Sequence, residues 1–121
     1  MMADKLNYQV LFVKDTRLPA IFFIEELGLE IEEDLLVGGK MCPVLRMFNG
    51  HRLMLVKHEQ KDPEVIVIYT QDCLRDFCNL KRQGFQMVSV PSYEKRGLTC
   101  EFYDPWGNLT LLLEERDYED A

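Results

Sequence analysis

Few residues of this chain are of the types that carry out chemistry, and their spacing forms no established catalytic motif. The sequence has no G-x-S-x-G nucleophile elbow, no phosphate-binding glycine loop and no H-E-x-x-H zinc motif. Glu101 is a candidate general base, because it lies two residues before Tyr103 on an expected strand and could point inward. An exposed strand residue is the simpler interpretation of the same position.

The cysteines and histidines are interpreted as structural or surface residues. The four cysteines are Cys42, Cys73, Cys78 and Cys100. They form no C-x-x-C pair, and Cys73 and Cys78, five residues apart on an expected helix, lie on different faces. Because the N-terminus shows no signal peptide, we expect reduced thiols in a cytoplasmic protein. His51, beside an expected hairpin turn, and His58, in a polar joint, are expected to be solvated.

Composition and charge limit the possible partners. Of the 121 residues, 47% are hydrophobic and 29% are charged, as expected for one soluble globular domain spanning residues 1–121. The formal net charge of −7 argues against a nucleic-acid partner, because such binding is dominated by neutralising phosphates. The same charge is mildly compatible with a cationic small molecule. No apolar stretch approaches the roughly 20 residues of a membrane span, so no membrane partner is expected.

The two halves of the chain contain the same order of expected elements. The first strand and helix span 8–13 and 16–27 in one half, and 65–70 and 73–83 in the other. Asp15 and Asp72 precede the two helices as N-cap signals. Gly28 and Gly84 follow the helices as C′ signals. The apolar stripes expected to face the core are Ile21, Ile24 and Leu27 in the first helix, and Leu74, Phe77 and Leu80 in the second.

Three further strands are expected after each helix. They span 29–31, 41–48 and 52–57 in the first half, and 86–90, 99–103 and 109–115 in the second. Asn49-Gly50 predicts a two-residue type I′ hairpin turn. This turn would place Leu45 opposite Met54, with Leu45, Met47, Arg52 and Met54 on one face. The acidic stretch 30–36 is either a loop or a strand edge. Each half therefore predicts a β-α-β-β-β module, at about 7–57 and 64–115.

The run from Asp104 to Asn108 is the most distinctive local signal. Pro105 fixes φ and Gly107 permits positive φ, so the run predicts a tight reversal. Together with the β-α-β-β-β repeat, the turn resembles the closing hairpin of the vicinal-oxygen-chelate superfamily. This superfamily includes glyoxalase I, extradiol dioxygenases and bleomycin-resistance proteins. The other matching motifs are Val13-Lys14-Asp15, Phe22-Phe23 and Leu27-Gly28 in the first module, and Thr70-Gln71-Asp72, Leu80 and Gly84 in the second. The resemblance implies an α+β fold: two βαβββ modules forming a curved mixed sheet with helices on the outer face, in a two-fold homodimer.

The resemblance also raises the question of a metal site. Metal enzymes of the superfamily use four ligands, one from the first and one from the last strand of each module. The matching positions here are Tyr8, Met54, Val65 and Leu111. Valine, methionine and leucine are not plausible ligands of a catalytic divalent metal, and tyrosine is an uncommon one. The resemblance therefore implies a metal-free member with no cofactor and no metal-ligating residue.

A metal-free member of this fold is expected to bind its ligand rather than convert it. The expected ligand is a small apolar or aromatic molecule held by burial and stacking, as in the drug-sequestering bleomycin-resistance branch. The residues expected to contact it are Tyr8, Phe12, Met54, Tyr69 and Leu111, with Arg52 as a polar anchor at the rim and Trp106 as a cover on the turn. Two alternatives stay open: a lyase, isomerase or dioxygenase of the same fold with an atypical or absent metal site, and a protein-interaction module.

Overall fold

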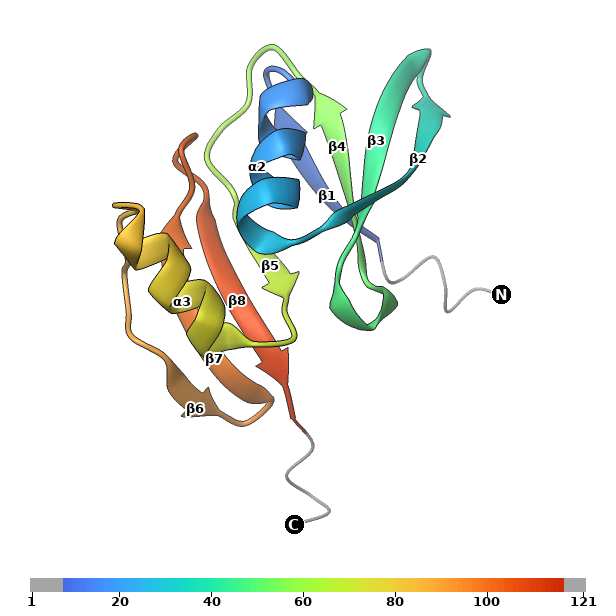
Figure 1. The fold of residues 1–121 in the computed structure, drawn as a ribbon. Helices are drawn as coiled ribbons and strands as arrows, with labels where there is room; N and C mark the ends of the chain where they lie inside the picture. Colours follow the sequence, from blue (N-terminus) through green and yellow to red (C-terminus); the bar gives the residue numbers. More distant parts are fainter. Residues whose placement is uncertain (1–7, 117–121) are drawn as a thin grey trace. The chain divides into compact units, whose positions relative to one another are not determined.

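The structure is a computed structural model that describes residues 8–116 of the chain. The chain folds into two compact units, and the boundary between them in the sequence falls between Asp62 and Pro63 (Figure 1). The first unit contains β1 (Tyr8–Val13), α2 (Arg17–Leu27), β2 (Glu30–Val37), β3 (Lys40–Arg46), a 3-10 turn (Phe48–Gly50) and β4 (Arg52–Lys57). The second contains β5 (Val65–Tyr69), α3 (Cys73–Arg82), β6 (Ser92–Glu94), β7 (Gly97–Tyr103) and β8 (Leu109–Glu115).

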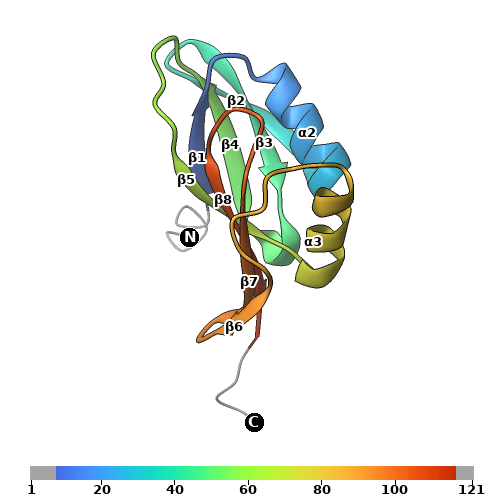
Figure 2. The ribbon, with the colours of Figure 1, turned by 90° about the vertical axis from the view of Figure 1, so that its left-hand side faces the viewer.

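Each unit has a four-stranded mixed sheet with the same topology. The strand orders are β1-β4-β3-β2 and β5-β8-β7-β6. The first strand of each unit runs parallel to the last, and the other neighbours are antiparallel. In both views each helix lies along one face of its own unit's sheet (Figures 1 and 2), and α3 packs on β7 and β8. The βαβββ repeat and the α+β class that the sequence predicts are confirmed.

The helix ends follow the predicted capping chemistry. Asp72 is the N-cap of α3, and its carboxylate accepts a hydrogen bond from the Arg75 backbone N–H at 3.0 Å. The Asp15 carboxylate accepts from the Leu18 backbone N–H at 3.1 Å in the first turn of α2. At the other end of α2, Gly28 adopts φ 75°, a left-handed conformation that costs glycine little. Neither helix has the length and apolar character that crossing a membrane requires, and the rest of the described chain adds no such helix.

The buried faces of both helices differ from the predicted stripes. In α2 the buried residues include Ala20, Phe23 and Leu27, whereas Ile21 is 42% exposed. In α3 they are Cys73, Asp76 and Leu80, whereas Leu74 is 55% exposed. The prediction of Ile21 and Leu74 as core residues is therefore wrong. Because α2 is apolar on several sides, periodicity could not select its core face, and in α3 the true face contains a carboxylate.

The hairpin between β3 and β4 is shifted by one residue from the predicted register. Leu45 lies opposite Leu53, and Val44 lies opposite Met54. The loop includes Phe48 as well as Asn49 and Gly50, so the Met47 backbone N–H donates to the His51 carbonyl at 2.6 Å. Because side chains alternate along a strand, this shift moves Leu45 and Met47 to the buried face, away from Arg52 and Met54.

Two predicted strands also change. The acidic stretch forms the edge strand β2, which runs on to Val37 and pairs with β3. Residues 86–90 form no strand beyond a single bridge between Met87 and Phe102, and the edge strand is instead β6. The hydroxyl of Ser89 accepts a hydrogen bond from the Glu101 backbone N–H at 3.0 Å, in place of a regular backbone ladder.

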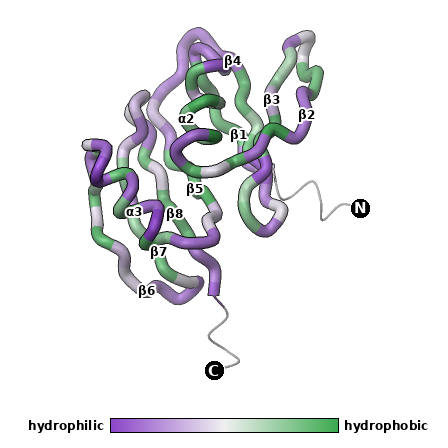
Figure 3. The backbone as a smooth tube through the Cα atoms, viewed as in Figure 1, coloured by the Kyte–Doolittle hydropathy of each residue, from purple (hydrophilic) through white to green (hydrophobic). Residues whose placement is uncertain are grey.

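Alternation along the strands separates a core face from an open face in each unit. Leu11, Leu53 and Leu55 are buried in the first unit, and Ile66, Ile68 and Leu112 are buried in the second. Hydrophobic residues follow α2 and most of the strands, while hydrophilic residues gather in the loops and in the acidic first half of β2 (Figure 3). The intervening strand residues face the side that no helix of the same unit covers.

Candidate functional site

The open face of the second sheet forms the floor of a pocket. Val67 lies opposite Leu111, and Leu111 lies opposite Glu101, so these side chains form one row across β5, β8 and β7. The next row consists of Tyr69, Leu113 and Thr99. Directly opposed residues of neighbouring strands project to the same side, so the two rows make a largely apolar surface.

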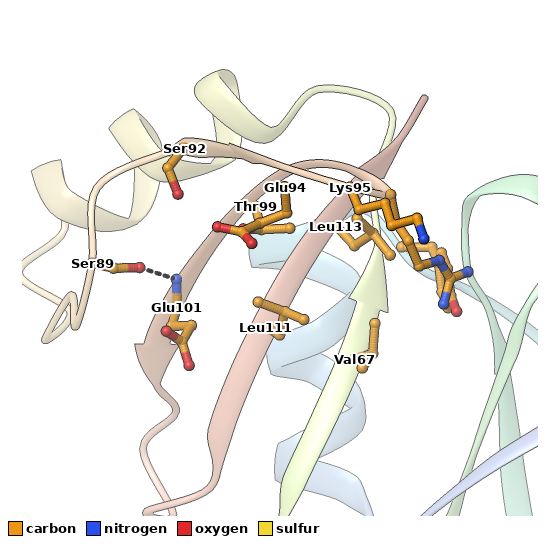
Figure 4. Close-up of a pocket in the computed structure, with 11 residues that line it drawn as sticks. Val67, Ser89, Ser92, Glu94, Lys95, Thr99, Glu101, Leu111 and Leu113 are labelled. Atoms are coloured by element: carbon orange, nitrogen blue, oxygen red, sulfur yellow. Dashed lines mark hydrogen bonds between the residues drawn. The ribbon is translucent and has the colours of Figure 1, made fainter. Parts of the chain in front are cut away.

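A polar wall borders this floor. It consists of Ser89, Ser92, Glu94, Lys95 and Arg96, which come from β6 and the loops on either side of it. The pocket is open to solvent and has a volume of about 600 Å³, within the range of small-molecule sites. All lining residues belong to the second unit, and Figure 4 shows them around the floor of Val67, Leu111 and Leu113.

The wall exists because the segment before β6 does not join the sheet fully. The Ser89 hydroxyl holds this segment to β7, and the Val88 backbone N–H donates to the Glu101 carbonyl at 2.8 Å. Pro91 follows, and a proline has no N–H for a ladder. The segment is therefore held to β7 at a few points only, and its polar side chains border the pocket.

The charged residues of the pocket differ in how they are partnered. Arg96 donates to the Glu115 carboxylate at 2.9 Å, and this hydrogen bond, with a smaller contribution from Tyr69, raises the pKa of the guanidinium. Glu101 is half-buried, and its carboxylate has neither a hydrogen-bond nor an ion-pair partner among residues 8–116. Within the described part of the chain, the Ser89 hydroxyl is the one side-chain partner of Glu101, and it accepts from the Glu101 backbone N–H. Of the four charged lining residues, Arg96 is paired with Glu115, Glu94 and Lys95 are exposed, and Glu101 is the half-buried carboxylate on the apolar row.

The structure brings together three of the residues singled out from the sequence. Tyr69, Leu111 and Glu101 line the pocket. Trp106, on the Asp104–Asn108 turn, does not line it. The roles of these residues in ligand binding stay predictions, because no ligand contact tests them.

The other four predicted ligand residues lie in the first unit. Tyr8 and Arg52 are opposite each other on β1 and β4, with the Arg52 guanidinium 5.6 Å from the Tyr8 ring centroid. Arg52 also forms an ion pair with Glu32. Phe12 makes an edge-on contact with His58 at 5.6 Å between ring centroids, and Met54 lies opposite Val10. These side chains form a separate group on the open face of the first sheet.

None of the five wall residues was predicted from the sequence, and neither were the floor residues Val67 and Leu113. Strand alternation places Val67 and Leu113 on the same face as Tyr69 and Leu111, and that signal was available. The charged wall had no comparable signal, because the sequence predicts a regular strand at 86–90. In the structure this segment makes a single bridge, Met87 with Phe102, and Ser89 contacts β7 through its side chain, so it is not a regular strand.

The turn from Asp104 to Asn108 is held by a buried hydrogen-bond network. The Asp104 carboxylate accepts from the backbone N–H groups of Trp106 and Asn108 at 2.9 and 2.8 Å, and from the Asn108 side-chain amide at 2.8 Å. The Asn108 side-chain oxygen accepts from the Glu64 backbone N–H at 2.9 Å. Both Asp104 and Asn108 are buried. The turn thereby ties β7 and β8 to the start of β5.

The side chains at the superfamily's ligand positions do not suit a catalytic metal. Of the four matched positions, Met54 lies opposite Val10, Leu111 opposite Val67 and Val65 opposite Leu109, and none of these side chains offers the nitrogen or oxygen donor that a catalytic divalent ion requires. The fourth position, Tyr8, lies opposite Arg52, whose guanidinium is 5.6 Å from the centroid of the tyrosine ring. Within the described part of the chain, no group of three or more histidine, cysteine, aspartate or glutamate side chains could hold a metal ion. We therefore derive no reaction step through a metal.

No protein-family model matches the sequence, and no curated protein does either. Solved structures do match. A member of the glyoxalase/bleomycin resistance protein/dioxygenase superfamily from Sphaerobacter thermophilus DSM 20745 is 21% identical with a TM-score of 0.72, covering 89% of this chain and 94% of its own. TnmS3, an antibiotic binding protein from Streptomyces sp. CB03234, is 19% identical with a TM-score of 0.71, covering 91% and 94%. TioX from Micromonospora sp. ML1 is 15% identical with a TM-score of 0.68, covering 90% and 97%. The chain therefore has the glyoxalase/bleomycin-resistance fold.

Proposed function

We propose that this protein is a glyoxalase/bleomycin-resistance-like binder of small molecules, in which the two units form one domain. The observation that carries this proposal is the pocket of the second unit, with its apolar floor, polar wall and volume of about 600 Å³. The similar fold of TnmS3, described as an antibiotic binding protein, supports the same class of function. Sequestration of an apolar or aromatic drug in the cytoplasm, without a metal, is the role we favour.

The floor can supply most of the binding free energy. Burial of apolar surface is worth about 25 cal/mol per Å², so a ligand that buries roughly 200 Å² of it gains about 5 kcal/mol. Association entropy offsets part of this gain, and the polar wall then orients the ligand. Val67, Leu111 and Tyr69 are the residues expected to make the apolar contacts.

Filling the pocket should weaken ligand binding. In Val67→Trp the indole would occupy the floor, and the affinity for any ligand found in a screen of aromatic compounds should fall at least about tenfold. Ligands are detected by the rise in melting temperature, since ligand at about 100 times Kd stabilises by about 2.7 kcal/mol. Amide chemical shifts of β5, β7 and β8 then locate the site.

Val65→Trp is the matched control. Val65 is two residues earlier on the same strand and the same face, is 71% exposed and does not line the pocket. The affinity of Val65→Trp for the ligand should stay within about twofold of that of the native protein. Equal affinities of Val67→Trp and the native protein would refute this pocket as the binding site.

The predicted residues of the first unit belong to the same proposal. Tyr8, Phe12, Arg52 and Met54 would contribute to ligand binding once the protein forms a homodimer, as superfamily members commonly do. The partly exposed Val10 and Phe12 are consistent with a surface that a ligand or a second copy covers.

An enzyme of the same fold is the alternative that one observation favours. Glu101 offers an unpartnered carboxylate inside the pocket, where it could act as a general base in a lyase, isomerase or dioxygenase reaction. Metal analysis of untagged protein after dialysis separates the two proposals with respect to a metal. A stoichiometric divalent ion would contradict the metal-free binder.

A further inference from the structure

The position of Glu101 in the pocket is unusual for a carboxylate. It shares its row with Leu111 and Val67, and its carboxylate has no partner within residues 8–116. Figure 4 shows the Glu101 side chain beside Leu111, on the opposite side of the floor from Lys95. A charge at this point depends on water for its solvation while the pocket is open.

A ligand that fills the pocket must remove some of that water. If the ligand is neutral and apolar, the carboxylate is left partly buried without a counter-charge, which is costly. If the ligand carries a protonated nitrogen at the same point, a charge-assisted hydrogen bond replaces the lost water. The loss of water around the Glu101 carboxylate therefore weakens the binding of neutral ligands relative to cationic ones.

We propose that the pocket selects ligands that combine an apolar body with a protonated nitrogen, and that Glu101 is the residue that determines this specificity. This inference rests on the small-molecule function proposed above. The apolar body lies on Val67, Leu111 and Leu113, and the nitrogen lies at the Glu101 side of the floor.

The other charged residues of the pocket are less suited to this role. Glu94 and Lys95 are exposed on the wall, so water screens their interactions with a ligand. Arg96 is already hydrogen-bonded to Glu115 at 2.9 Å. Glu101 is the pocket carboxylate that is half-buried, which is why its charge has the largest effect on selection.

Three indoles of similar shape and different charge test the inference. Tryptamine is cationic at neutral pH, 3-ethylindole is neutral and indole-3-propionate is anionic. Affinities are measured by titration of amide chemical shifts in the native protein, in Glu101→Gln and in the control Asp62→Asn, which removes an exposed carboxylate that does not line the pocket. The native protein should bind tryptamine roughly tenfold more tightly than 3-ethylindole, and indole-3-propionate most weakly.

The variants distinguish a direct role from a general effect of the acidic protein. Glu101→Gln should bind tryptamine and 3-ethylindole within about twofold of each other, while Asp62→Asn should keep the native preference. Equal binding of the two indoles by the native protein, or an unchanged preference in Glu101→Gln, would overturn the specificity and leave the pocket in place. If none of the three indoles shifts the β5, β7 and β8 amides, the proposed pocket falls together with the inference.

Discussion

Asp76 shows that a polar side chain can lie on the buried face of a helix. It is 3% exposed at the base of α3, and its carboxylate accepts hydrogen bonds from the Thr70 hydroxyl and, at 3.4 Å, from the Arg75 guanidinium. Burial raises the pKa of Asp76 above its usual value of 3.8, and the hydrogen bonds from Thr70 and Arg75 oppose this rise. A search for apolar stripes passes over such a residue, which is why the predicted face of α3 was wrong.

Asp76→Asn should change how stability depends on pH. Because the folded-state pKa of Asp76 is raised, its contribution to the free energy of unfolding is fully present below the unfolded-state pKa and is lost as pH rises through the folded-state pKa. Asn cannot ionise, so the variant should gain stability relative to the native protein between pH 4 and pH 7. Urea unfolding at both pH values measures the difference.

The control for this prediction is Asp62→Asn, because Asp62 is exposed. The free energy of unfolding of that variant should differ from that of the native protein by nearly the same amount at pH 4 and at pH 7. A difference for Asp76→Asn that is constant from pH 4 to pH 7 would contradict the assignment of a buried, partly desolvated carboxylate.

The pairing of β6, β7 and β8 depends on a close backbone approach at Gly97. Gly97 begins β7, lies opposite both Glu94 and Glu115, and has a φ of 152°. A Cβ at this position would overlap the Glu114 carbonyl oxygen and lie 2.9 Å from its carbonyl carbon. Only glycine fits here, and its presence lets the wall segment turn back onto the sheet.

Gly97→Ala should therefore destabilise the protein by about 3 kcal/mol, since the backbone at Glu114 must move. Gly107→Ala is the matched control. Gly107 also has a positive φ, of 85°, but open space around it, so its cost should be about 1 kcal/mol. Chemical denaturation measures both values, and a cost for Gly97→Ala no larger than that for Gly107→Ala would show that the close approach does not limit stability.

The homodimer is a prediction for the molecule as a whole. Val10 and Phe12 leave apolar side chains 39% and 40% exposed on the first sheet. Burial of such side chains between two copies would be favourable. Sedimentation velocity over a range of concentrations should show a dimer of about twice the 14.3 kDa chain mass at micromolar concentration. A monomer throughout that range would count against the dimer and against ligand sites shared between copies.

Much of the fold could be predicted because its signals are local. The bounds of β1, β4 and β8 agree with the predicted strands, and the capping roles of Asp72 and Gly28 follow from their own backbone geometry. The repeat of one pattern in both halves then indicates the fold class. Tyr69 and Leu111 could be assigned to the open face because strand alternation needs no knowledge of distant contacts.

The remaining features depend on contacts between residues far apart in the chain. A one-residue shift of the hairpin at Asn49-Gly50 follows from the way Leu45 packs opposite Leu53, and no turn motif encodes it. The pocket wall follows from the hydrogen bond between Ser89 and Glu101, twelve residues apart. Sequence patterns therefore determine which elements form, because capping and alternation are local. The strand registers, the buried helix faces and the pocket are decided only in the tertiary structure, because there side chains from different elements compete for the same space and the same hydrogen bonds.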